Sequence, residues 1–120
     1  MKEPKFNFEE LKVYQKALDF VDATDTLTKT FPKDELYGLT SQYKRAAVSI
    51  SLNIAEGAGD TNAQFNRYLQ VAWDSVKECV VCSTIARRQQ YISEKDDKTT
   101  RLQLEELAKM IVSLQKYLKK

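Results

Sequence analysis

The stretch that decides the fold runs from Tyr37 to Gly59 and has the sequence YGLTSQYKRAAVSISLNIAEGAG. Drawn at about 100° per residue, it predicts one long helix that is apolar on two opposite sides. The wider arc contains Leu39, Tyr43, Ala46, Ala47, Ile50 and Ile54. The nearly opposite arc contains Val48, Leu52 and Ala55. A helix packed on one core needs a single apolar stripe. Because the chain is too short for two cores, we expect the second neighbour to be another subunit.

A line of polar residues separates the two arcs, at spacings of three and four. It consists of Gln42, Arg45, Ser49, Asn53 and Glu56. Polar side chains between two apolar surfaces must find partners, and they then fix the register of packing. We therefore favour a structural role over ligand binding. Arg45 is expected to bind a carboxylate of a neighbouring helix or subunit, and Ser49 and Asn53 to bind backbone at a helix crossing. Together with Leu52, these residues form the predicted subunit-interface stripe.

Periodicity and breaks predict three more helices. The first ends at Phe31-Pro32, because the residue before a proline is disfavoured in helical geometry. Gly57 and Gly59 end the second, Asp60 or Thr61 can cap the third, and Ser93 begins an approximate capping box for the fourth. The helices are expected at about residues 8–30, 37–57, 62–90 and 93–118. Short connections favour antiparallel neighbours, so the sequence predicts an all-α, up-down-up-down four-helix bundle and a single domain over residues 1–120.

The third helix also has more apolar surface than one contact requires. Its main face is expected to contain Phe65, Leu69, Ala72, Trp73, Val76, Val80 and Ala86. Val71, Cys82 and Ile85 are expected on another side. The seam of the fourth helix is expected to contain Leu104, Leu107, Ala108, Ile111, Leu114 and Leu118. This excess of apolar surface again favours an oligomer.

Three segments carry a resemblance to a known family. They are FEELKVYQKALDF at residues 8–20, RAAVSISLNIAEG at 45–57 and FNRYLQVAWDSVKE at 65–78. The chain resembles the four-helix-bundle proteins encoded in intervening sequences of bacterial 23S ribosomal RNA genes, a family related to the accessory variability protein of diversity-generating retroelements. The resemblance implies a cytosolic protein that forms a pentamer and has no known enzymatic activity. It marks Arg45, Ser49, Asn53, Glu56 and Gly57 as motif positions, with no catalytic role attached.

The sequence departs from the usual family pattern at several positions. They are Ser51, Leu52, Asp74, Cys79 and Cys82. Asp74 replaces a glycine and adds a charge. If that position faces a partner in the family, we expect the partner to differ here.

Composition narrows the class of protein. The 120 residues are 30% charged and 42% hydrophobic, as expected for a folded helical domain. No secretory signal is apparent in the sequence, and no apolar run approaches the ~18 residues that span a bilayer. Two cysteines in such a chain fit a reducing compartment. We therefore expect a cytoplasmic protein without membrane contact.

Enzymatic chemistry has little support in the sequence. The chain has no histidine, which removes the commonest general base and metal ligand. Cys79 and Cys82 form a C-x-x-C in the middle of a predicted helix, where buried small apolar residues are the favoured interpretation over a redox pair or zinc site. The carboxylates lack the Glu-x-x-His partners of a di-iron bundle. We expect no catalytic residue, metal or cofactor.

Basic residues are in excess only after Asp60, and the formal net charge is +2. The residues that make this excess are Arg67, Lys77, Arg87, Arg88, Lys116, Lys119 and Lys120. A solvated mixed surface is the favoured interpretation, and a nucleic-acid footprint is the alternative. With the resemblance, the leading hypothesis is a non-enzymatic homo-oligomeric scaffold, with a pentamer favoured, that binds RNA, DNA or a nucleic-acid-processing protein. A protein-binding adaptor without nucleic-acid contact is the alternative.

Overall fold

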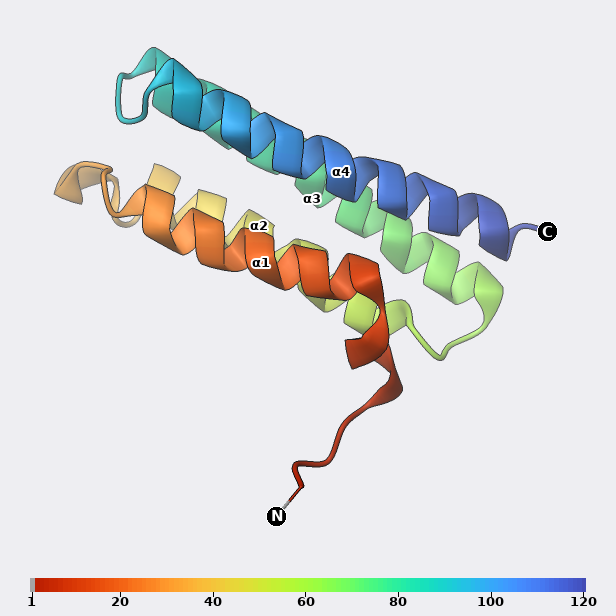
Figure 1. Cartoon of the computed structure of the whole chain (residues 1–120). Helices are drawn as coiled ribbons and strands as arrows, with labels where there is room; N and C mark the ends of the chain where they lie inside the picture. The colour runs from red at the N-terminus through yellow and green to blue at the C-terminus, as the bar shows by residue number, and fades with distance from the viewer. Residues whose placement is uncertain (1) are drawn as a thin grey trace.

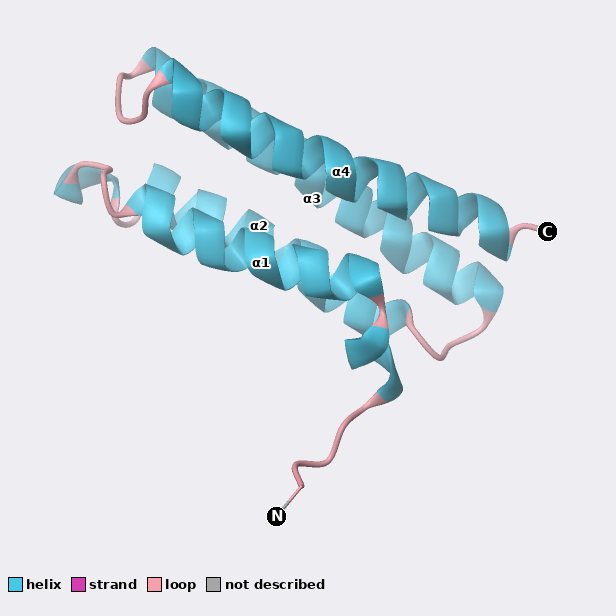
Figure 2. Cartoon of the chain, in the orientation of Figure 1, coloured by secondary structure: helices cyan, strands magenta, loops and turns pink. Residues whose placement is uncertain are grey.

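A computed structural model describes residues 2–120 and contains four long helices packed as a bundle (Figure 1). They are α1 (Lys12–Thr28), α2 (Leu39–Gly57), α3 (Asn62–Arg88) and α4 (Glu94–Leu118). Two short 3-10 helices, η1 (Asn7–Glu10) and η2 (Lys33–Glu35), precede α1 and α2. Within these residues there is no strand (Figure 2). The all-α class is therefore confirmed, and Figure 1 shows each helix returning alongside the one before it.

The predicted ends of the helices were close but need three corrections. Leu11 is extended (φ −68°, ψ 125°), so the expected helix at 8–30 divides into η1 and the shorter α1. The expected helix at 37–57 begins two residues later, at Leu39. The helix at 62–90 ends at Arg88, because Gln90 adopts a positive φ of 65° and closes the helix with hydrogen bonds from Gln90 N to Arg87 O and from Tyr91 N to Ala86 O. This is a Schellman motif with glutamine where glycine is usual.

Side chains cap the starts of the last three helices. Thr61 Oγ1 accepts from Gln64 N at 3.2 Å, and Ser93 Oγ accepts from Asp96 N at 3.0 Å, so both sequence-predicted caps form. Gly38 precedes α2 and has no side chain to offer. The Glu35 carboxylate substitutes for it, since Oε1 accepts from Leu39 N at 3.1 Å. These caps satisfy amide groups that a helix start leaves without partners.

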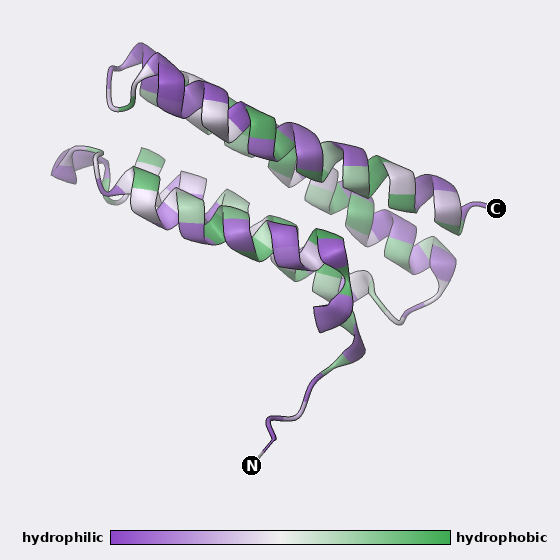
Figure 3. Ribbon diagram, in the orientation of Figure 1, coloured by the Kyte–Doolittle hydropathy of each residue, from purple (hydrophilic) through white to green (hydrophobic). Residues whose placement is uncertain are grey.

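The core is drawn from one side of each helix. All six residues of the wider α2 arc are buried, and Ile50 and Ile54 are fully so. Fully buried partners on the other helices include Ala17, Leu69, Ala72, Cys79, Ala86 and Ile111. Figure 3 shows the alternating hydrophobic and hydrophilic bands that this one-sided burial produces on the ribbons. Cys82 is 2% exposed and belongs to this core, which corrects its expected place on a second side of α3.

The helices differ in how closely they approach one another. α2 and α3 make the most extensive contact, and α1 and α4 the least extensive of the four neighbouring pairs. At Gly57 a Cβ atom would lie 2.8 Å from Tyr68 Cβ and 3.2 Å from Phe65 Cα. Glycine is therefore required where the end of α2 meets the start of α3. Among residues 2–120, no helix combines the length and hydropathy needed to cross a membrane.

Candidate functional site

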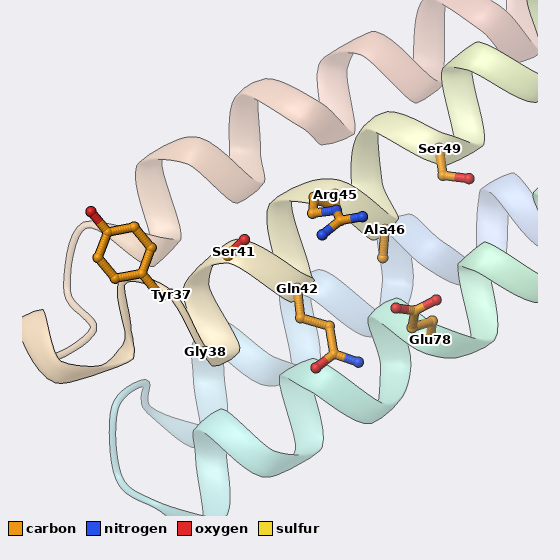
Figure 4. A pocket seen from close by; sticks show the side chains of 8 residues that line it. All are labelled: Tyr37, Gly38, Ser41, Gln42, Arg45, Ala46, Ser49 and Glu78. Carbon is orange, nitrogen blue, oxygen red and sulfur yellow. The ribbon is translucent and has the colours of Figure 1, made fainter.

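A groove of about 530 Å³ runs between α2 and α3 and contains part of the predicted polar line (Figure 4). It is lined by Tyr37, Gly38, Ser41, Gln42, Arg45, Ala46, Ser49 and Glu78. Figure 4 shows Gln42 pointing from α2 towards α3, with Arg45 on α2 and Glu78 on α3. The structure therefore gathers Gln42, Arg45 and Ser49 around one surface depression. We call this depression the α2–α3 groove.

Arg45 is exposed, and within residues 2–120 it forms no ion pair. The expected bond to a carboxylate of a neighbouring helix is therefore absent within the protomer, although Glu78 lines the same groove. An exposed arginine beside an exposed carboxylate gives the groove both signs of charge. Such a surface can pair with a partner of alternating charge.

Ser49 and Asn53 connect the groove to the bundle. Asn53 Nδ2 donates to Ser49 O at 2.8 Å and to Ser49 Oγ at 3.0 Å. Ser75 Oγ of α3 donates to Ser49 Oγ at 2.9 Å, which makes a polar link between the two helices. Ser49 thus lies at a helix crossing, as expected, but the backbone that Asn53 binds belongs to its own helix. Glu56, at the end of the line, is exposed.

An apolar surface lies beside this groove on the outer side of α2 and α3. Its members are Val48 (39% exposed), Leu52 (57%), Val71 (46%), Val81 (56%) and Ile85 (42%). Leu52 lies about one turn from Ser49, and Val71 about one turn from Ser75, so the linked serines bring these apolar side chains close to the same crossing. We call this set the outer apolar face. It contains Val48 and Leu52 of the second arc of α2, as well as Val71 and Ile85, which the sequence placed away from the core.

The basic residues do not gather into one patch on the protomer. Arg67 lies near the start of α3 and Arg88 at its end, roughly 30 Å away at 1.5 Å per residue. Lys116, Lys119 and Lys120 lie at the end of α4, and all three are exposed. Lys77, in the middle of α3, pairs with Asp74 at 3.4 Å and lies 5.9 Å from the Trp73 ring centroid.

Arg87 differs from the other basic residues because a buried carboxylate holds it. Arg87 Nη1 lies 3.2 Å from Asp97 Oδ2. The neighbouring Tyr91 is also engaged: its hydroxyl donates to Glu35 at 2.9 Å, and its ring packs against Phe31 at 5.6 Å. Tyr91 is thus engaged within the protomer through both its hydroxyl group and its ring.

Asp97 was missed by the sequence analysis. It is 2% exposed, accepts from Ser83 Oγ at 2.6 Å and binds both Arg87 and Arg101 Nε, the latter at 3.0 Å. Burial opposes ionisation of Asp97, but the hydrogen bonds from Ser83 and Arg101 and the two arginine charges outweigh it, so the pKa lies below its ordinary value. The sequence signal that could have revealed Asp97 is its position. It lies seven residues before Leu104 and therefore on the same core-facing seam of α4.

Cys79 and Cys82 are both free and buried. Burial raises the pKa of Cys79 and, with the charge of Glu78, raises that of Cys82 to about 11, so both thiols are protonated near neutral pH. Within residues 2–120, no cluster of three or more candidate side chains could hold a metal ion.

The four long helices and their packing define an all-α helical-bundle protein. The model of the 23S rRNA-intervening sequence protein family matches residues 9–113, and the chain belongs to this family. A crystal structure of a protein of unknown function from the S23 ribosomal protein family of Bacteroides thetaiotaomicron has a similar fold. It is 24% identical, with a TM-score of 0.79, and the match covers 87% of this chain and 98% of that one. A comparison with curated proteins finds no match. Neither the family description nor the structural relative indicates an enzyme.

Proposed function

We propose that this chain is the subunit of a non-enzymatic homo-oligomeric scaffold that binds nucleic acid or a nucleic-acid-processing protein. The outer apolar face carries the proposal. Its five side chains, between 39% and 57% exposed, line one side of the most closely packed helix pair. Exposed apolar side chains gathered beside a polar groove are typical of protein–protein contact surfaces. Five copies is the number favoured by the family resemblance.

The mass of the particle in solution tests the assembly. Light scattering behind size exclusion, at micromolar concentration, is expected to give about five times the 13.8 kDa subunit mass. A monomer at every concentration would refute the scaffold. A clean dimer would refute the pentamer alone.

The nucleic-acid part of the proposal is supported by the separated basic groups. A protomer with a net charge of +2 and basic side chains near both ends of the bundle has only a weak electrostatic field of its own. Repetition around a symmetry axis multiplies weak phosphate contacts into measurable avidity. Binding is therefore expected to require the oligomer and to be independent of sequence.

A filter-binding titration with structured RNA and duplex DNA, at low and moderate salt, tests this part. Affinity is expected to fall steeply with salt and to fall further in Arg88→Glu. Arg88 is a better choice than Arg87, because Arg87→Glu would also break the contact with Asp97. Lys95→Glu, at an exposed position of the first turn of α4, controls for a general change of charge. No binding at low salt would favour the protein-adaptor alternative.

A further inference from the structure

Two arginine side chains from different helices meet at one buried oxygen atom, where the end of α3 lies beside the first turns of α4. Arg87 Nη1 lies 3.2 Å from Asp97 Oδ2, and Arg101 Nε lies 3.0 Å from the same atom. Asp97 is 2% exposed, whereas the two arginine side chains are 39% and 42% exposed. The carboxylate is thus enclosed, and the two guanidinium groups lie next to each other at the surface. We call Arg87, Asp97 and Arg101 the two-arginine cluster.

The contacts within this cluster hold both guanidinium groups in position. Arg101 is held at two points, because its Nη2 donates to Thr84 Oγ1 while its Nε donates to Asp97. Asp97 is itself fixed by Ser83 Oγ, which donates to Oδ1 at 2.6 Å. A free arginine on a surface loses side-chain entropy when it binds a ligand, whereas an arginine that is already held loses less. The cluster is therefore organised before any ligand arrives.

Both guanidinium groups keep N–H donors that no acceptor within residues 2–120 occupies. In this part of the chain, Arg87 donates only through Nη1 and Arg101 only through Nε and Nη2, although every nitrogen of a guanidinium group carries hydrogen. The charges of the cluster do not cancel, since one carboxylate faces two cations. The lowered pKa of Asp97 keeps it ionised at neutral pH, so the cluster retains a single net positive charge.

The neighbouring side chains on α4 favour an anion at this place. Lys98 is exposed and lies one turn before Arg101 on the same side of the helix. Glu105, one turn after Arg101, pairs with Lys109 at 3.6 Å, which compensates part of its charge. The planar fork of a guanidinium group matches the oxygen atoms of a phosphate group, and a tetrahedral phosphate can accept from two such groups at once. The cluster therefore offers a phosphate group two oriented sets of donors.

We propose that the two-arginine cluster is the site at which this protein binds a backbone phosphate group of a nucleic acid. Arg87 and Arg101 each donate to one of its non-bridging oxygen atoms, and Asp97 keeps the two donors next to each other. Contacts with backbone phosphates carry no base specificity, which agrees with binding that is independent of sequence. The inference rests on the nucleic-acid part of the proposed function and deepens it, because it assigns one oriented phosphate contact to each subunit.

Fluorescence anisotropy of a labelled RNA hairpin, titrated with the full chain at low and moderate salt, tests this site. Arg101→Lys keeps the charge but loses the planar fork, and it is expected to weaken binding about fivefold. Arg101→Gln also loses the charge, so it is expected to weaken binding about tenfold and to make the slope of log affinity against log salt shallower by about 1. Lys16→Gln controls for the loss of one charge, since Lys16 lies on α1 and is also ion-paired, with Glu106 at 3.3 Å. It is expected to change the affinity by less than about twofold.

Equal affinity of Arg101→Lys and the wild type, or equal losses in Arg101→Gln and Lys16→Gln, would overturn the site and leave nucleic-acid binding itself intact. A wild type that binds labelled poly-glutamate but no RNA at low salt would overturn both, and would assign the cluster to an acidic protein partner. Circular dichroism and light scattering establish that each variant is folded and keeps the wild-type mass. If the Arg101 variants do not fold, chemical protection of the wild type decides. RNA is expected to shield Arg87 and Arg101 from an arginine-specific dicarbonyl reagent, and unchanged modification of both would overturn the site.

Discussion

The inner and outer sides of the α2–α3 pair are both apolar, yet they differ in burial. Ile50 is fully buried, whereas Leu52, two residues later on the opposite side of α2, is 57% exposed. On α3, Leu69 is fully buried and Val71 is 46% exposed. The fold of the protomer thus accounts for one apolar side of each helix and leaves the other in solvent. The difference shows that a helix can carry the core and still present apolar surface to another molecule.

The largest effect is expected from Ile50→Asp, which places a carboxylate without a partner on the inner side. Burying such a charge costs several kcal/mol, here about 4 kcal/mol or more, a large fraction of the ~5–15 kcal/mol that stabilises a domain. Circular dichroism is expected to show loss of most helical signal at 25 °C. Ile50→Val, which keeps the apolar character, is expected to cost about 1 kcal/mol and to remain helical. A cooperative melt of Ile50→Asp near that of the wild type would contradict the assignment of the inner side.

Asp97→Asn tests the buried carboxylate of Asp97, a charged group in the interior of the bundle. The substitution removes the negative charge that Arg87 and Arg101 share, and we expect the free energy of unfolding to fall by about 2–3 kcal/mol. This is below the range for a fully buried pair, because both arginine side chains are about 40% exposed. Asp96→Asn, at the exposed neighbouring position, is the matched control and is expected to cost much less. Urea denaturation of both variants measures the difference.

The same carboxylate predicts a dependence of stability on pH. The pKa of Asp97 is lower in the folded protein than the ordinary aspartate value of 3.8. Its contribution is therefore fully present above the unfolded pKa and is lost as the pH falls through the folded pKa. The stability difference between the wild type and Asp97→Asn is expected to be constant from pH 5 to 7 and to shrink below about pH 4. A difference that does not change down to pH 2 would refute this role.

Gly57→Ala tests how closely the end of α2 packs against the start of α3. The new Cβ would lie 2.8 Å from Tyr68 Cβ and would force α2 and α3 apart, at a cost of about 1–3 kcal/mol. Ala23→Val provides the comparison, since Ala23 lines a space of about 290 Å³ between α1 and α4, where the added methyl groups have room. It is expected to change stability by less than about 0.5 kcal/mol. Thermal melts of the two variants compare the packing of α2 on α3 with the packing of α1 on α4. Equal losses of stability would mean that the two contacts are equally tight.

Much of this arrangement could be predicted from the sequence, because periodicity reports which side of a helix is apolar. The wide arc of α2, the caps at Thr61 and Ser93 and the exposure of Leu52 all followed from spacing and side-chain chemistry. Periodicity does not show which residues outside the main apolar face of a helix are covered by a neighbouring helix. Cys82 was assigned to the wrong side for this reason, since it is only 2% exposed in the folded bundle.

The polar part of the structure was predicted less well. Spacing placed Ser49 at a crossing, but its partner Ser75 lies 26 residues away and no local pattern connects the two. Asp97 was missed because its three partners come from two helices and meet only in the folded bundle. The end of α3 was placed two residues too late because Gln90 adopts a conformation that usually signals glycine. Pairwise contacts between distant segments are the information that periodicity lacks.

Cys79→Ala is expected to have a smaller effect on the inner side. Cys79 is fully buried, so loss of its sulfur leaves a small void that costs about 1–2 kcal/mol. Because burial raises the pKa of both thiols, neither is expected to react with a thiol reagent until the protein unfolds. A colorimetric thiol assay with and without urea measures this. Rapid reaction of the native protein, or loss of a bound metal on mutation, would contradict the structural role.

The smallest effect on the protomer is expected from Leu52→Asp, although its effect on assembly should be the most informative. The side chain is 57% exposed, so the substitution should cost the protomer only about 0.5 kcal/mol, the difference in helix propensity. In an oligomer built on the outer apolar face, the same carboxylate would be buried without a partner, and light scattering is expected to show dissociation. Leu102→Asp is a close control, because Leu102 lies on α4 and is 59% exposed. If both variants keep the wild-type mass, the outer apolar face is not the interface. If both dissociate, the contact extends to α4. If Leu52→Asp melts the helices, the two sides of α2 have been assigned the wrong way round.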